Sequence, residues 1–283
     1  MRIDSHQHFW KLDARRGQWP PPSLGAIHRD FLPADLVPEL QRAGVDGTVL
    51  VQSLPEVADT RFLLALADRH PFVLGVVGWA DLKAGDASAT IRALARHRAL
   101  KGLRPMLHDL DDPAWIDDPA LDPAIRTMVA LGLTLDALVR TEHLPALLRF
   151  ARRHPELPIV VDHAAKPDIA AGGPAGWRDA LAALAALPGV HVKLSGLLTE
   201  AGARAGRDAI APFVAEVLSL FGVERVMWGS DWPVLRLAGE YGAWLSLCEA
   251  LVPADAHDAV FAGNACRFYR LEQTGLPACE EKP

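Results

Sequence analysis

The chain alternates regularly between two kinds of segment, and this alternation constrains its fold more than any other feature. Eight short apolar runs are each followed by an amphipathic stretch rich in alanine and leucine. Most runs are continuous in valine, isoleucine and leucine, which is typical of parallel strands covered on both faces. The runs begin near Arg2, Asp46, Phe72, Leu100, Leu133, Pro158, Val190 and Arg225. The helical patterns cover residues 33–43, 57–70, 87–97, 121–131, 143–154, 177–187, 210–221 and 242–251.

Eight such units close naturally into a barrel. The sequence therefore predicts a single-domain α/β protein, a (β/α)8 TIM barrel, over residues 1–271. The alternative is an open, doubly wound sheet. A dinucleotide-binding version of that sheet is disfavoured, because no GxGxxG pattern follows an early strand. Beyond Leu271 the chain turns polar, which predicts a separate C-terminal tail over residues 272–283.

The composition argues against several classes of partner. The net charge of −6 comes with no basic stripe, so we expect neither a nucleic-acid nor a membrane partner. The three cysteines form no CxxC pair, which argues against a disulfide framework and a cysteine zinc site. The first residues lack the apolar core of a signal peptide, and no apolar run reaches the roughly 18 residues of a membrane span. We therefore expect a cytoplasmic protein, and the sequence carries no signature of an oligomeric state.

One connection, residues 9–32, is unusually long and holds Trp10, Trp19, His28 and three consecutive prolines. Long connections in compact domains are often functional lids. This one leaves the same strand end as the first histidines, so it is placed to cover the mouth of the barrel. The alternative is a rigid surface loop pinned by its tryptophans. Both interpretations stay open at this point.

Two histidines end the first predicted strand. His6 and His8 stand two residues apart, so the two side chains share one face of the strand. Two imidazoles placed in this way can share a metal ion or a substrate oxygen. Catalytic residues of barrel enzymes collect at the carboxyl ends of the strands, which favours a functional role over a structural one.

Two further residues end later strands. Asp231 follows the apolar run VMWG and can take a proton from water, although an aspartate there can also be a helix N-cap. His163 ends the run PIVVDH, where the alternative is a histidine that caps the next segment. Strand alternation predicts that Asp162 points to the opposite face, so that only His163 lines the barrel.

Charged residues elsewhere in the strands are candidates for substrate contacts. Arg104 ends the run LKGLRP and can hold a carbonyl or carboxylate, the alternative being a surface ion pair. Lys193 shares a strand face with Ser195, and an inward lysine in so apolar a strand needs an anion or a polar site. Asp136 is a weaker candidate that must be paired if it faces the interior. His108 follows the fourth strand within reach of a substrate.

Five motifs in order identify a family resemblance. They are DSHQHFW, KGLRPML, VVDHAAKP, VKLSG and MWGSDWPV. Together they resemble the amidohydrolase-related (family 2) proteins of the amidohydrolase superfamily, in the branch of sugar-lactone (fuconolactone and rhamnonolactone type) and pyrone-dicarboxylate lactonases. The resemblance runs from Met1 to about Leu271. It implies the barrel fold, and it implies that the active centre consists of His6, His8, His163 and Asp231.

The resemblance also bears on metals. The wider superfamily can hold two metals with the help of a strand-four lysine or glutamate and a strand-five histidine. This chain has Arg104 in the fourth strand and LTLDALV in the fifth, so a two-metal site is not expected. We expect either no required cofactor or one divalent metal, Zn²⁺, held by His6, His8 and Asp231.

The resemblance implies a hydrolase of carboxylic ester bonds that opens a sugar (aldono) lactone in carbohydrate catabolism. Asp231 would activate water, while histidines and Arg104 would stabilise the carbonyl oxygen. Two alternatives are a metal-dependent decarboxylase and a non-catalytic barrel that binds sugar acids. Sugar lactones are favoured over aromatic ones, because few cations stand ready to bind anions. The expected substrate contacts are Arg104, Lys193, Trp10, His108 and Trp232.

Overall fold

The computed structural model describes residues 1–173 and 175–272. Eight parallel strands lie side by side in chain order. They are β1 (Ile3–Gln7), β2 (Gly47–Val51), β3 (Val73–Gly78), β4 (Leu100–Leu103), β5 (Thr134–Ala137), β6 (Ile159–Val161), β7 (Val190–Leu194) and β8 (Val226–Trp228). The barrel closes where Asp231 N donates to His6 O at 2.7 Å and His8 N donates to Trp232 O at 2.7 Å. The prediction of a single-domain (β/α)8 barrel is confirmed.

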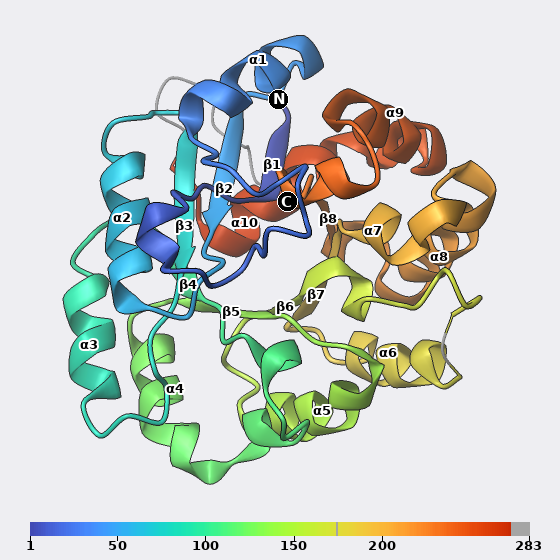
Figure 1. The fold of residues 1–283 in the computed structure, drawn as a ribbon. Coiled ribbons are helices and arrows are strands. Elements are labelled where there is room, and N and C mark those ends of the chain that lie inside the picture. The colour runs from blue at the N-terminus through green and yellow to red at the C-terminus, as the bar shows by residue number, and fades with distance from the viewer. Residues whose placement is uncertain (174, 273–283) are drawn as a thin grey trace.

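A layer of helices surrounds the strands (Figure 1). Pro33 opens the first of them, a position where its missing N–H costs nothing, and Asp35 accepts from Leu32 N at 2.9 Å. The helix predicted over residues 210–221 begins at Arg207, three residues before the predicted start. The helices are α1 (Pro33–Ala43), α2 (Val57–Ala67), α3 (Ala87–Leu94), α4 (Asp122–Ala130), α5 (Leu144–Arg153), α6 (Trp177–Ala185), α7 (Leu197–Ala201), α8 (Arg207–Phe221), α9 (Tyr241–Leu251) and α10 (Asn264–Tyr269).

The amino ends of the strands are closed by α10, which sequence patterning did not predict as a separate helix. Phe268 and Tyr269 belong to one buried apolar cluster with Ile3 and Met227. At the same end, Arg270 O accepts a hydrogen bond from Lys101 Nζ. The barrel therefore has a sealed amino end, and its carboxyl end is left for chemistry.

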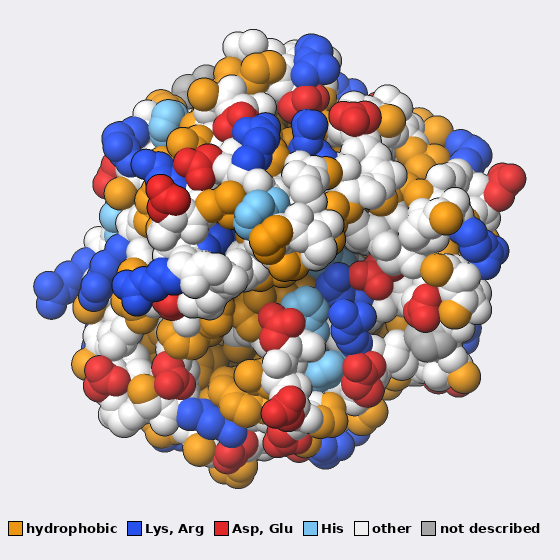
Figure 2. Space-filling view, in the orientation of Figure 1, with side chains coloured by type: hydrophobic (Ala, Val, Ile, Leu, Met, Phe, Trp, Pro, Cys, Tyr) orange, Lys and Arg blue, Asp and Glu red, His pale blue; other side chains and the backbone are white. Residues whose placement is uncertain are grey.

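The loop of residues 9–32 lies at the carboxyl end. Trp10 and Phe31 exchange two backbone hydrogen bonds, of 2.9 and 3.0 Å, which close the loop at its base. Figure 1 shows the loop crossing in front of the strands. Figure 2 shows a hollow below it, floored by apolar side chains, with histidine and cationic side chains at its edge.

Two further expectations concern the absence of a membrane span and the polar C-terminal tail. Within residues 1–173 and 175–272, no helix has both the length and the apolar character needed to cross a bilayer. The predicted polar tail lies outside the described residues, except for Glu272.

Candidate active site

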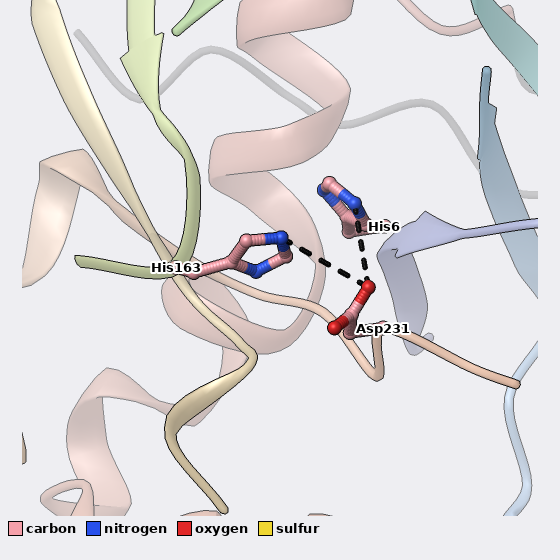
Figure 3. Close-up of side chains that lie close together, drawn as sticks. All are labelled: His6, His163 and Asp231. Atoms are coloured by element: carbon pink, nitrogen blue, oxygen red, sulfur yellow. Dashed lines mark ion pairs between the residues drawn. The ribbon is translucent and has the colours of Figure 1, made fainter. Parts of the chain in front are cut away.

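Three histidines converge on one carboxylate at the carboxyl end of the barrel, and Figure 3 shows two of them, His6 and His163, directed towards Asp231. Nε2 of His8 lies 3.1 Å from Asp231 Oδ1, Nε2 of His6 lies 3.7 Å from it, and Nε2 of His163 lies 3.9 Å from it. All four side chains are at least nine-tenths buried. The structure thus brings together the four residues that the sequence singled out from β1 and from the ends of β6 and β8.

Backbone conformation aims two of these side chains. Asp231 has φ 58°, and His163 has φ 53°, followed by Ala164, Ala165 and Lys166 with φ of 49°, 61° and 48°. The strand β6 ends at Val161, so strand alternation ends there too. The expectation that only one of Asp162 and His163 lines the barrel is therefore wrong, since both point inward.

Each histidine is held through its other ring nitrogen. Nδ1 of His8 donates to Val51 O at 2.7 Å, and Nδ1 of His163 lies 2.8 Å from Ser195 Oγ. Nδ1 of His6 lies 3.1 Å from Lys193 Nζ. Such outer partners fix the orientation of an imidazole and leave Nε2 directed into the site. A neutral His8 therefore carries a lone pair at Nε2.

Burial and neighbouring charges set the protonation of the centre. Burial lowers the pKa of His6, His8 and His163, so the imidazoles are neutral at pH 7. Burial alone would raise the pKa of Asp231, but its contacts with His163 and His8 and the charge of Lys166 lower it below its usual value. The centre therefore combines neutral imidazoles with an ionised carboxylate.

This donor set fits one divalent metal. Neutral imidazole nitrogens and a carboxylate oxygen are the ligands that Zn²⁺ takes, and the ligand atoms of His6, His163 and Asp231 all lie within 4.8 Å of one another. Nε2 of His8, one of the expected ligands, is 3.3 Å from Nε2 of His6, and His163 is the candidate ligand that the structure adds to the expected set. No second group of three such ligands occurs within residues 1–173 and 175–272.

Beneath the histidines lies a network of paired charges. Nη1 of Arg104 is 3.3 Å from Asp162 Oδ2, and its Nη2 donates to Gln52 O. Nζ of Lys193 is 2.5 Å from Asp136 Oδ2 and 3.1 Å from Asp162 Oδ1. All these side chains are buried. The anion that an inward Lys193 requires is thus supplied by the protein itself.

Sequence reasoning missed Asp162, Gln52 and the supporting role of Ser195. Asp162 had a signal, because it stands beside His163 in the motif. The partners of Gln52 and Ser195 lie at the ends of other strands, 52 and 32 residues away in the chain, so local sequence carries no trace of them. Tyr269 adds a further partner from α10, whose hydroxyl donates to Asp136 Oδ2 at 2.7 Å.

The remaining expected substrate contacts are Trp10, Trp232 and His108. Trp10 is fully buried and donates from Nε1 to Arg29 O at 2.8 Å. The ring of Trp232 meets that of Phe31 at a centroid distance of 5.2 Å, in the packing under the loop. His108 keeps 17% of its side chain exposed and lies 3.2 Å from Asp109 Oδ1. Substrate contact by these three residues stays a prediction.

Comparisons with known proteins agree with the geometry. A family model described as "Amidohydrolase" matches residues 3–271. The chain is 56% identical over 279 residues to an L-fucono-1,5-lactonase of Burkholderia ambifaria, and the match covers 96% of each chain. It is 37% identical to an L-fucono-1,5-lactonase of Burkholderia multivorans, covering 96% of this chain and 97% of the other. A solved amidohydrolase of Burkholderia multivorans with bound zinc superimposes with a TM-score of 0.90 at 38% identity, covering 96% of this chain and all of that one.

Proposed function

The chain belongs to the amidohydrolase family, and on that premise we propose that it is a hydrolase that opens the ring of a sugar lactone. The observation that carries the proposal is the convergence of three neutral imidazoles on the ionised Asp231 at the carboxyl end of the barrel. The 56% identity to an L-fucono-1,5-lactonase makes L-fucono-1,5-lactone the first candidate substrate.

Asp231 is proposed as the general base. Its Oδ1 accepts a proton from a water molecule whose oxygen attacks the lactone carbonyl carbon. The bond between this carbon and the ring oxygen then breaks, and Asp231 returns the proton to the departing alkoxide. The product is an open-chain hydroxy acid, so atoms and charge balance with water as the co-reactant.

The carbonyl oxygen gains negative charge during the attack. Nη1 of Arg104 lies 3.4 Å from Nε2 of His6, so a guanidinium stands beside the imidazoles where that charge develops. His163 can donate from Nε2 when Ser195 Oγ donates to its Nδ1. A divalent metal held by His6, His8, His163 and Asp231 would polarise the same oxygen and acidify bound water.

The charges favour a neutral substrate. Arg104 and Lys193 are buried and paired with Asp162 and Asp136, so neither is left as a free cation for a substrate carboxylate. A pyrone dicarboxylate would need such cations, whereas an aldonolactone needs hydrogen-bond partners for its hydroxyl groups. This pairing supports a sugar lactone.

A lactone panel tests the proposal. Acid release is followed with a pH indicator for L-fucono-1,5-lactone, other aldonolactones and an aromatic lactone. We expect turnover of aldonolactones and a loss of about 10³-fold or more in kcat for Asp231→Asn. The exposed Asp255 provides the matched control, because Asp255→Asn should leave the rate unchanged. Near-wild-type turnover by Asp231→Asn would contradict the mechanism, and a panel without turnover would contradict the function.

Metal analysis is a separate measurement. Because the described residues hold one group of candidate ligands, formed by His6, His163 and Asp231, we expect no more than one zinc per chain after exposure to excess zinc and gel filtration. His6→Ala should lower the bound zinc, and the rate before and after chelation shows whether turnover needs it. Two zinc ions per chain would contradict the single-site interpretation.

A further inference from the structure

Lys166 and Glu200 form an ion pair at the margin of the centre. Nζ of Lys166 donates to Glu200 Oε1 at 2.6 Å. Lys166 ends the left-handed turn that begins at His163, and its backbone N donates to His163 O at 2.8 Å. Glu200 lies in α7, between β7 and α8. The pair therefore comes from the carboxyl ends of two neighbouring strands, β6 and β7.

The pair lies next to the turn that carries His163 and is only partly covered. The two side chains keep 14% and 15% of their surface exposed, unlike the sealed Lys193 below them. Lys166 follows His163 by three residues on the same left-handed turn, and Nε2 of His163 lies 3.9 Å from Asp231 Oδ1, so the pair stands at the edge of the centre. A substrate held at Asp231 would therefore lie beside Lys166 and Glu200.

The pair has unused hydrogen-bonding capacity. A lysine ammonium has three donors, and within residues 1–173 and 175–272 only one of those of Lys166 is used. Oε2 of Glu200 likewise has no hydrogen bond within these residues. Lys193 differs, because its ammonium contacts Asp136, Asp162 and His6. Lys166 and Glu200 thus offer a charged donor and a charged acceptor side by side.

Backbone contacts hold the two residues in place. Ala170 N donates to Glu200 O at 3.0 Å, and Trp177 Nε1 donates to Ala164 O at 2.8 Å. The first bond connects α7 to the segment that follows Lys166, and the second connects α6 to the turn that carries Lys166. The left-handed turn costs free energy, so its persistence indicates that the surroundings fix the position of Lys166.

We propose that Lys166 and Glu200 form the subsite that binds the hydroxyl groups of the sugar ring. Each hydroxyl group is both a donor and an acceptor, so an adjacent pair of hydroxyls matches an ammonium beside a carboxylate. The subsite selects hydroxylated lactones over bare lactone rings. This inference rests on the proposed lactonase function and assigns its substrate specificity to two residues.

The test compares two lactones of the same ring size, L-fucono-1,5-lactone and δ-valerolactone, which lacks hydroxyl groups. Loss of charge-assisted hydrogen bonds should lower kcat/KM for the sugar lactone about 10- to 100-fold in Lys166→Met and in Glu200→Gln, mainly through KM. The value for δ-valerolactone should change less than about 3-fold. Lys166→Arg keeps a charged donor and should restore part of the selectivity.

Arg178 provides a control variant, because it forms an ion pair of 2.7 Å with Glu216 on the outer helices α6 and α8. Arg178→Met should change neither lactone's kcat/KM. Equal losses on both lactones in Lys166→Met would mean a purely structural or electrostatic role and would overturn the subsite, as would no loss on either. A wild-type enzyme that opens neither lactone would instead overturn the proposed function.

Discussion

Single residues in strained backbone conformations hold the centre together. Asp231 and His163 both have positive φ, a conformation that costs non-glycine residues of order 1 kcal/mol or more. Asp231 is held by its hydrogen bond to His6 O, and His163 by the contact with Ser195. In regular strand geometry, successive side chains of each strand alternate between the inside and the outside of the barrel. The left-handed angles of Asp231 and His163 instead direct both side chains into the centre.

Gly196 gives a test of how closely the His163 ring must be placed. A Cβ at Gly196, where φ is +67°, would lie 2.8 Å from Cγ and Nδ1 of His163. The ring must therefore shift in Gly196→Ala, and misplacement by about 1 Å can lower kcat/KM about 10²-fold. Gly176, with φ +81° and nothing within 4 Å, is the matched control. Equal activity in the two variants would show that the position of the ring is not critical.

Lys193 carries a prediction about stability. Its ammonium lies fully buried between Asp136 and Asp162. Lys193→Met leaves buried carboxylates without compensation, so the free energy of unfolding should fall by about 3–5 kcal/mol in urea titrations. Adding Asp136→Asn to this variant removes one of those charges and should recover part of the loss. A double variant no more stable than Lys193→Met would contradict the charge-pairing explanation.

At the scale of elements, Arg15 attaches the loop of residues 9–32 to the barrel. Arg15 is buried, and its guanidinium donates to Ser53 O at 3.1 Å, Ser53 Oγ at 2.7 Å and Trp19 O at 3.0 Å. It also stands 5.1 Å from the ring centroid of Trp10. Ser53 follows β2, so these bonds connect the loop to the rim. We propose that the loop acts as a fixed wall of the mouth.

Removing this attachment should loosen the wall. In Arg15→Ala we expect faster cleavage within the loop during limited chymotrypsin digestion, and a KM raised about 10-fold as substrate contacts become less ordered. Arg16 is exposed, so Arg16→Ala provides the adjacent control. If both variants resist digestion as the wild type does, the loop is held by its aromatic packing and not by Arg15.

Sequence patterning predicted the elements well and their ends less well. Continuous apolar runs located all eight strands, because parallel barrel strands are covered on both faces. The histidines and Asp231 were found because they end such runs. The inward position of Asp162 was not predicted, because it depends on the left-handed turn after β6. The residue types in VVDHAAKP do not specify positive φ. Contacts such as Ser195 with His163 depend on the register of two neighbouring strands, which local sequence does not specify.

At the scale of the whole molecule, the two ends of the barrel have different roles. The carboxyl end carries the histidines and Asp231, while the amino end is closed by α10 and apolar packing. The Tyr269 hydroxyl on α10 bonds to Asp136, which pairs with Lys193, which in turn contacts His6. A continuous chain of contacts therefore joins the sealing helix to the centre. Stability at the amino end and geometry at the carboxyl end are expected to be coupled.

The amino end also gives a prediction about pH. His191, on β7, packs against Phe268 at a ring centroid distance of 4.8 Å, and burial, helped by the charges of Arg225 and Arg267, lowers its pKa to about 4. An unfolded histidine titrates near pH 6.5. Between these values the unfolded state binds one more proton than the folded state, so the contribution of His191 to stability is lost as pH falls from about 6.5 to 4.

Burial raises the pKa values of Asp4 and Asp59 to about 6, so these two residues change the free energy of unfolding with pH in the direction opposite to His191. The test therefore compares the pH profile of the wild type with that of a His191 variant. The free energy of unfolding of His191→Gln minus that of the wild type should grow by roughly 2 kcal/mol from pH 7 to pH 4. This is less than the full shift implies, because the ring is partly exposed. Urea titrations at several pH values measure the difference. A difference independent of pH would mean that His191 is protonated equally in both states.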